Sequence, residues 1–167
     1  AAGLMGITLP EADGGQGGSL MDAVIAIETV ALVDPRAADV VQQGNFGAIR
    51  TIAEYAAPEQ KARLLPGLLA GERVIGLGMT EPDAGSAVTD LATRAEPDGE
   101  GWRVSGAKVF TSHSAEAALF LIYVRFGPGV DGIGSVLIER GAEGFELGAA
   151  RRYMNGEEWR PLYLDQV

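Results

Sequence analysis

Apolar residues recur at helical spacing through the first 72 residues of the chain. They predict a first helix over residues 19–33, with Ser19 as its cap. A second helix is expected over 35–57, weakened in its middle by two glycines, and a third over 58–69, interrupted by a proline. The apolar positions of the first helix are Leu20, Val24, Ile27, Val30 and Ala31.

From residue 73 onward the pattern changes to short strands separated by turn residues. Turns are expected at residues 98–101 and 105–106. Regular short strands with such turns are typical of a β-sandwich or barrel. The strands are expected at residues 74–79, 92–95, 102–104, 108–111, 119–125, 135–139 and 161–165.

The pattern therefore predicts an α+β fold in two parts. Residues 1–72 are expected to form an N-terminal α-helical segment, and residues 73–167 a small antiparallel β-barrel or sandwich domain. A hydrophobic content of 47% argues against a disordered chain. The first residue is not methionine and patterned sequence begins at once, so we expect the chain to be a piece of a longer protein.

Charge and residue content exclude several classes of protein. Thirteen basic and 23 acidic residues give a net charge of −10, which disfavours nucleic acid or an anionic membrane as a partner. No apolar run approaches the roughly 18–20 residues that span a membrane. The absence of cysteine excludes disulfides and thiolate zinc sites, and the single histidine, His113, cannot form a multi-histidine metal site.

The stretch from Gly76 to Ser86 is the first candidate site. A strand ends here in a turn with proline and glycine, which places the Thr80 and Ser86 hydroxyls near exposed backbone N–H groups. This arrangement suits a pyrophosphate or the edge of a flavin. A strand that ends in an ordinary capped turn accounts for the same residues, so the local chemistry leaves both interpretations open.

The stretch over residues 108–114 is the second candidate site. Phe110 lies beside three hydroxyls and an imidazole, a set that could stack on a ring and hydrogen-bond its edge. Alternatively, Phe110 belongs to the core and the other residues form a polar loop. His113 has no neighbouring cysteine or histidine, which is more typical of a surface or structural residue than of a metal ligand.

Four segments, taken in order, resemble the acyl-CoA dehydrogenase family, and the resemblance extends over nearly the whole chain. GLMGITLPE with the later GGQG, and the stretch from PEQK to GE, resemble parts of the family's N-terminal helical domain. MTEPDAGS resembles the family's first signature, and GAKVFTS resembles its second flavin-contact strand. These segments occupy residues 3–17, 58–72, 79–86 and 106–112.

The resemblance implies FAD bound at the β domain. Thr80 and the backbone before it would face the pyrimidine edge of the flavin. Gly85 and Ser86 would approach the pyrophosphate, with Ser86 also near the acyl-CoA. Phe110 would pack on the flavin ring, and Ser112 would hydrogen-bond near the flavin N5. The full set of implied cofactor contacts is Leu77, Gly78, Met79, Thr80, Gly85, Ser86, Phe110, Thr111 and Ser112.

The implied reaction is α,β-dehydrogenation of an acyl-CoA thioester, in which a carboxylate takes the α proton and the flavin takes the β hydride. The family's base lies in a C-terminal helical domain, so no catalytic residue is expected in this chain. The resemblance also implies electron-transfer flavoprotein or a similar acceptor, a homodimer or homotetramer, and a cytoplasmic location, or the mitochondrial matrix in a eukaryote. The alternatives are a non-catalytic partner subunit of the same fold and a flavin-dependent oxidase or monooxygenase.

The sequence departs from the family pattern in two places, and the second departure points to a divergent branch. Ala87 follows the Gly-Ser pair at a position where the family usually has aspartate. Residues 153–159 replace the more usual segment of the glycine-Met-Arg-Gly-Ser type. The sequence does not identify the acyl group that such a branch would accept.

Overall fold

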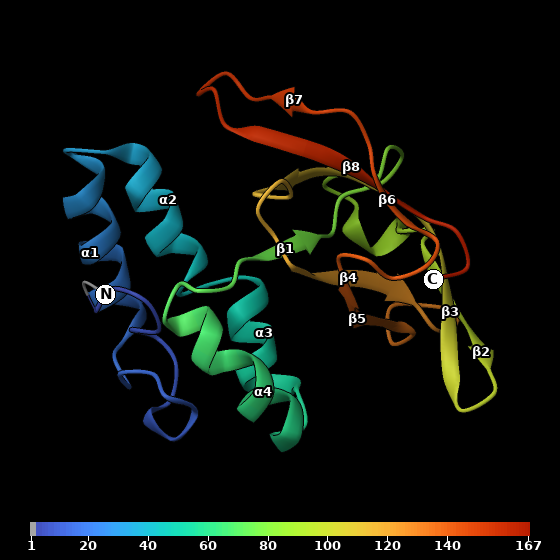
Figure 1. Cartoon of the computed structure of the whole chain (residues 1–167), viewed down its shortest axis with the longest axis horizontal. Helices are drawn as coiled ribbons and strands as arrows, with labels where there is room; N and C mark the ends of the chain where they lie inside the picture. The colour runs from blue at the N-terminus through green and yellow to red at the C-terminus, as the bar shows by residue number, and fades with distance from the viewer. Residues whose placement is uncertain (1–2) are drawn as a thin grey trace. The chain divides into compact units, whose positions relative to one another are not determined.

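The computed structural model describes residues 3–167 and divides the chain into two compact units (Figure 1). The first unit is Ala1–Arg73 and the second is Val74–Val167. The division expected from the sequence lies one residue before this boundary. Within the described residues, no helix is both long enough and apolar enough to cross a membrane.

The first unit is helical, as the sequence predicts. Ser19 and Asp22 form a reciprocal capping box at the start of the first helix, and the Asp34 side chain caps the second. A short 3-10 turn, η1 (Glu11–Asp13), precedes them. The helices are α1 (Leu20–Ala31), α2 (Pro35–Gln43), α3 (Ala48–Tyr55) and α4 (Pro58–Leu69).

The single helix expected over residues 35–57 is wrong, because the chain breaks into α2 and α3. Gly47 adopts a positive φ of 59°, which a helix cannot include. Between the two helices, the fully buried Asn45 side chain donates to the carbonyls of Leu4 and Val41, each at 2.8 Å. This amide therefore fixes the break in place.

The expected interruption of α4 by Pro66 is also wrong, because the helix continues to Leu69. A proline removes one intrahelical hydrogen bond. Leu64, Leu65 and Leu68 on either side of it are buried, and their packing holds the helix through that position.

The second unit is a curled sheet of eight strands. Their order is β1-β4-β2-β3-β8-β6, with β5 paired to β4 and β7 to β8. A 3-10 turn, η2 (Val88–Asp90), lies between the first two strands. The strands are β1 (Ile75–Gly78), β2 (Arg94–Asp98), β3 (Gly101–Ser112), β4 (Leu119–Arg125), β5 (Ile133–Glu139), β6 (Phe145–Leu147), β7 (Arg151–Arg152) and β8 (Glu158–Leu164).

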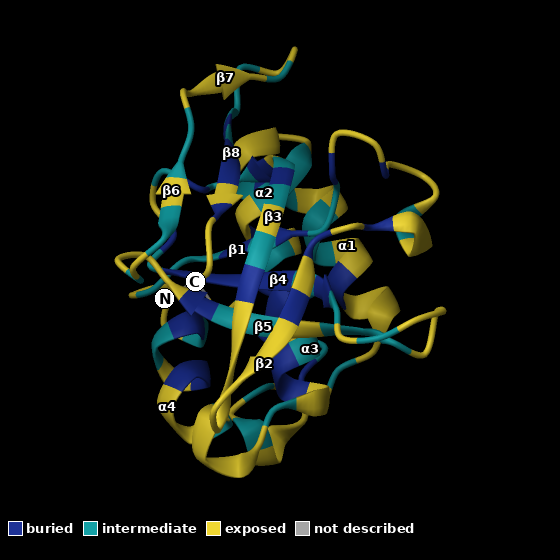
Figure 2. Ribbon diagram, turned by 90° about the vertical axis from the view of Figure 1, so that its right-hand side faces the viewer, coloured by how far each residue is buried: buried dark blue, intermediate teal, exposed yellow. Residues whose placement is uncertain are grey.

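The predicted α+β class is confirmed, but the sheet is mixed rather than wholly antiparallel. β1 runs parallel to β4, with Ile75 opposite Leu119. The β2–β3 hairpin lies between these two strands in the sequence, and this long connection allows β4 to return in the same direction as β1. The buried β4 and the largely exposed β2 are visible in Figure 2.

The expected pair of strands at 102–104 and 108–111 is one continuous strand, β3, so the turn expected at 105–106 is wrong. Gly106 has a φ of 151°, and a Cβ there would lie 2.5 Å from Thr93 Oγ1. Glycine at this position therefore permits a close approach of two segments instead of a turn. The first half of β3 pairs with β2 and the second half with β8.

The core of this unit is apolar and is built mainly from β4. Phe120, Ile122 and Val124 of that strand are fully buried and pack with residues from β2, β3, β5 and β8. The core residues are Ala95, Val104, Ala117, Phe120, Ile122, Val124, Ile138, Leu162 and Leu164.

Candidate functional site

The end of β1 lies beside the second half of β3, so the two candidate segments meet. Leu77 and Gly78 are the last residues of β1, and Met79 and Thr80 follow directly. The Val109 N–H donates to the Thr80 carbonyl at 2.9 Å. This hydrogen bond joins two segments that the sequence could only place separately.

A buried ion pair reinforces the same junction. Lys108 of β3 is fully buried, and its Nζ lies 2.7 Å from Glu81 Oε1 and 3.2 Å from the Met79 carbonyl oxygen. The Glu81 carboxylate also accepts hydrogen bonds from the N–H groups of Ala92 and Thr93, at 2.6 and 2.9 Å. The pair thus ties the loop after β1 both to β3 and to the segment that leads into β2.

Burial and hydrogen bonding act in opposite directions on this pair. Burial alone would raise the pKa of Glu81, but the hydrogen bonds that it accepts from Lys108 and the backbone hold that pKa below its ordinary value of 4.5. Burial lowers the pKa of Lys108, opposed by the attraction of Glu81. The sequence reasoning gave neither residue a role.

Gly85 and Ser86 lie on an exposed turn beyond Glu81. The backbone groups of Glu81 and Ala84 hydrogen-bond to each other in both directions, at 3.1 and 3.3 Å. A Cβ built on Gly85 would meet no atom within 4 Å, so the main chain is open on that side. The structure therefore places these two residues on the same loop as Thr80, with their backbone accessible to a ligand.

Phe110 presents its ring at the surface from a strained position. Its side chain is 53% exposed and its φ is 58°, in a region where the register of β3 against β8 shifts between Lys108 and Thr111. Positive φ is rare for a bulky residue, and strand irregularities of this kind occur often beside functional sites. The interpretation of Phe110 as a core residue is therefore wrong.

Two further rings surround Phe110. The centroid of the Trp159 ring lies 4.6 Å from that of Phe110, and the Tyr153 ring is stacked at 6.3 Å. The Arg151 guanidinium lies 5.7 Å from the centre of the Trp159 ring. Tyr153 belongs to the segment that departs from the family pattern, and the sequence reasoning gave it no role.

Thr111 and Ser112 face different surroundings. The Thr111 side chain is fully buried, and its Oγ1 has no hydrogen-bond partner within residues 3–167. The whole residue is buried, so the chain's own atoms enclose its main chain as well as its side chain. The Ser112 hydroxyl is partly accessible and lies 3.4 Å from the Tyr153 hydroxyl.

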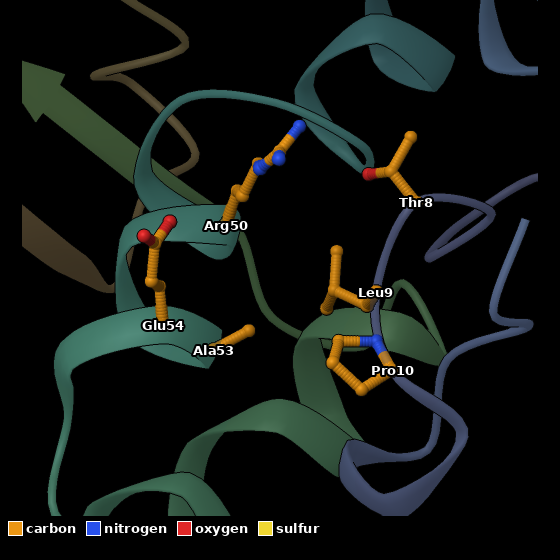
Figure 3. A pocket seen from close by; sticks show the side chains of 6 residues that line it. All are labelled: Thr8, Leu9, Pro10, Arg50, Ala53 and Glu54. Carbon is orange, nitrogen blue, oxygen red and sulfur yellow. The ribbon is translucent and has the colours of Figure 1, made fainter. Parts of the chain in front are cut away.

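A cavity of about 250 Å³ lies within the helical unit (Figure 3). Arg50 and Glu54 lie one turn apart on α3 at its edge, opposite the loop that carries Thr8. None of the residues expected to bind a cofactor lines it. The lining residues are Thr8, Leu9, Pro10, Arg50, Ala53 and Glu54.

Comparisons with known proteins place both units in one family. The N-terminal domain of acyl-CoA dehydrogenases matches residues 1–72, and the middle domain of acyl-CoA dehydrogenases matches residues 76–167. The second match alone covers more than half of the chain.

The named relatives differ in the reaction that their names describe. The chain is 37% identical over 149 residues to a 3-sulfinopropanoyl-CoA desulfinase of Variovorax paradoxus, covering 88% of this chain and 37% of that protein. It is 34% identical over 148 residues to the mitochondrial isobutyryl-CoA dehydrogenase of Dictyostelium discoideum, covering 87% of this chain and 35% of that protein.

A solved structure supports the same assignment. A glutaryl-CoA dehydrogenase from Mycobacterium smegmatis in complex with FADH2 superposes with a TM-score of 0.89 at 27% identity, covering 99% of this chain and 42% of that one. The chain spans less than half the length of these three proteins. From the two domain matches and the shared fold, the chain belongs to the acyl-CoA dehydrogenase family.

Proposed function

We propose that the chain forms part of an FAD-dependent enzyme that dehydrogenates an acyl-CoA thioester between its α and β carbons. The observation that carries this proposal is the hydrogen bond from Val109 to the Thr80 carbonyl, which brings the end of β1 against the segment that presents Phe110. The FADH2 complex of a relative with the same fold supports FAD as the cofactor.

The residues present fit such a cofactor. Phe110 offers an exposed ring for stacking, and the main chain at Gly85 leaves room for a pyrophosphate. We assign the flavin edge to Thr80 and to the backbone of Leu77, Gly78 and Met79. Ser86 is assigned to the pyrophosphate and acyl-CoA, and Ser112 to the flavin near N5. Thr111 is buried beside Ser112 and is assigned no direct contact.

When bound, the flavin accepts the hydride from the β carbon. The chain's own residues then serve to bind and orient that ring, which sets the distance and direction of the transfer. No residue of this chain is assigned as the base that removes the α proton. Electron-transfer flavoprotein or a similar acceptor, a homodimer or homotetramer, and a cytoplasmic or mitochondrial-matrix location complete the proposal.

A second candidate is the removal of a sulfinate group from an acyl-CoA. It is favoured by the 37% identity to the desulfinase of Variovorax paradoxus, which is higher than the identity to the dehydrogenase of Dictyostelium discoideum. Both reactions act on a CoA thioester in a flavoprotein fold. The two candidate functions can therefore be distinguished by the acyl-CoA substrate that the protein converts.

The test begins with the flavin content of the purified full-length protein, measured by absorbance. Short and branched acyl-CoA thioesters are then added without oxygen. Bleaching of the flavin is expected for a dehydrogenase. Release of sulfite from 3-sulfinopropanoyl-CoA without bleaching would instead support the desulfinase. A protein with no bound or bindable flavin would overturn both candidates, and rapid reoxidation by oxygen would point to an oxidase.

Phe110→Ala supplies the matched test of the site itself. Loss of the stacking contact, worth about 0.5–1.5 kcal/mol, should weaken FAD binding about two- to twelvefold. Phe126→Ala is the control, because Phe126 is also partly exposed and also contacts a neighbouring ring, that of Trp102, edge to face. Equal FAD affinity in the two variants would remove Phe110 from the site.

A further inference from the structure

We propose that Tyr153 is a positioning residue that holds the Phe110 backbone and sets the direction of the Ser112 hydroxyl. The inference rests on the proposed function, since Phe110 and Ser112 are assigned there to the flavin. Tyr153 is 41 residues from Ser112 in the sequence and lies in the segment that departs from the family pattern.

The first contact fixes where the phenol proton goes. The Tyr153 hydroxyl lies 2.8 Å from the Phe110 carbonyl oxygen. A carbonyl oxygen can only accept, so the single proton of the Tyr153 hydroxyl must be donated to it. This bond restrains the Phe110 backbone, which has a positive φ of 58°.

The second contact follows from the first. The Ser112 hydroxyl lies 3.4 Å from the Tyr153 hydroxyl, whose only proton is already committed to Phe110. Ser112 must therefore be the donor and Tyr153 the acceptor in this pair. With its proton directed at Tyr153, Ser112 can meet any third group only as an acceptor.

This restriction distinguishes the two redox states of a flavin. The N5 atom of an oxidised flavin has a lone pair and accepts hydrogen bonds, whereas N5 of a reduced flavin carries hydrogen and donates. An accepting Ser112 hydroxyl pairs with the reduced state and leaves the oxidised state without a donor. Tyr153 should therefore raise the midpoint potential of the bound flavin.

Tyr153→Phe removes the hydroxyl and keeps the ring that stacks on Phe110. In the full-length flavoprotein, we expect a more negative midpoint potential, because Ser112 becomes free to donate to oxidised N5. The dissociation constant of the reduced flavin is expected to rise about fivefold, because one ordinary hydrogen bond that favours this state is lost. Tyr163→Phe is the control, since Tyr163 lies on β8 opposite Ala107 and Glu146, outside this cluster.

A double-mutant cycle with Ser112→Ala tests the route of the effect. If Tyr153 acts through Ser112, Tyr153→Phe should no longer change the potential when Ser112 is alanine. An unchanged potential in Tyr153→Phe, or the same change in both backgrounds, would overturn the inference while the proposed function stands. A wild-type protein that binds no FAD would instead refute the proposed function.

If Tyr153→Phe does not fold, Ser112→Ala alone still tests the direction of the Ser112 hydroxyl. Loss of an accepting hydroxyl should make the midpoint potential more negative, whereas loss of a donating hydroxyl should make it more positive. A more positive potential in Ser112→Ala would therefore contradict the assigned direction of the hydroxyl.

Discussion

Gly76 lies in the strand that leads into the candidate site, and its backbone passes against the ring of Phe120. A Cβ at this position would lie 2.7 and 2.9 Å from two atoms of that ring. Phe120 is fully buried in the core, so its ring has no room to withdraw. The missing side chain therefore sets how closely β1 approaches β4.

Gly76→Ala should destabilise the fold by about 1–3 kcal/mol, because the added methyl group overpacks the core. The free energy of unfolding, measured with a chemical denaturant, checks this value. Gly141→Ala is the matched control, since a Cβ there meets nothing within 4 Å. An equal loss of unfolding free energy in the two variants would mean that the contact with Phe120 does not contribute to stability.

Residue patterns revealed part of the site but not its connections. The expected contacts at residues 77–86 and 110–112 follow from short motifs, which are local in the sequence. The link between Tyr153 and Phe110 spans 43 residues, and the pairing of Lys108 with Glu81 spans 27. No short sequence motif identifies the partner in either contact, so the two contacts become apparent only in the folded structure.

At the scale of elements, a buried ion pair helps to hold the loop after β1. Glu81 is the shared acceptor for Lys108 of β3 and for two backbone N–H groups in the segment just before β2. A buried charge is tolerated only when it is paired in this way. Three elements thus depend on one carboxylate.

Lys108→Met should cost about 3–5 kcal/mol of stability, because the Glu81 carboxylate is left buried without its cation. Lys108→Met combined with Glu81→Gln should be less destabilised than the single variant, since glutamine is neutral and still accepts a backbone hydrogen bond. Thermal and denaturant unfolding of both variants measure the difference. A double variant no more stable than Lys108→Met would show that the charge is not the cause.

Helices and strands that are marked by nearby sequence features, such as a cap or an apolar run, were predicted well. Those whose structure depends on contacts with distant segments were not. The strand at 119–125 matches β4 at both ends, and a capping box marks the start of α1. The parallel pairing of β1 with β4, by contrast, is a property of topology. The Ser105–Gly106 dipeptide resembles a turn, but neighbouring β2 and β8 keep it extended within β3.

At the scale of the whole molecule, the apolar core of the second unit is formed entirely from its own residues. The cluster extends from Ala95 to Leu164, and all of its members lie within Val74–Val167. A unit of this size buries enough apolar surface to fold alone. The ion pair and the Tyr153 contacts also lie within it.

The segment 74–167, expressed alone, should therefore unfold in one cooperative transition. Circular dichroism and tryptophan fluorescence should report the same midpoint, since Trp102 and Trp159 both lie in this unit. Removal of the Phe120 side chain by Phe120→Ala should abolish the transition or lower its midpoint. A gradual transition in the unmutated segment would show that it depends on residues outside 74–167.

The left-handed backbone at Phe110 also limits how this position can change during evolution. Valine and isoleucine, common exchanges in strands, are strongly disfavoured at a φ of 58° because of their branched Cβ. Asparagine and glycine tolerate that backbone but carry no ring. The backbone conformation therefore restricts which residues can replace Phe110, independently of any selection for ligand binding.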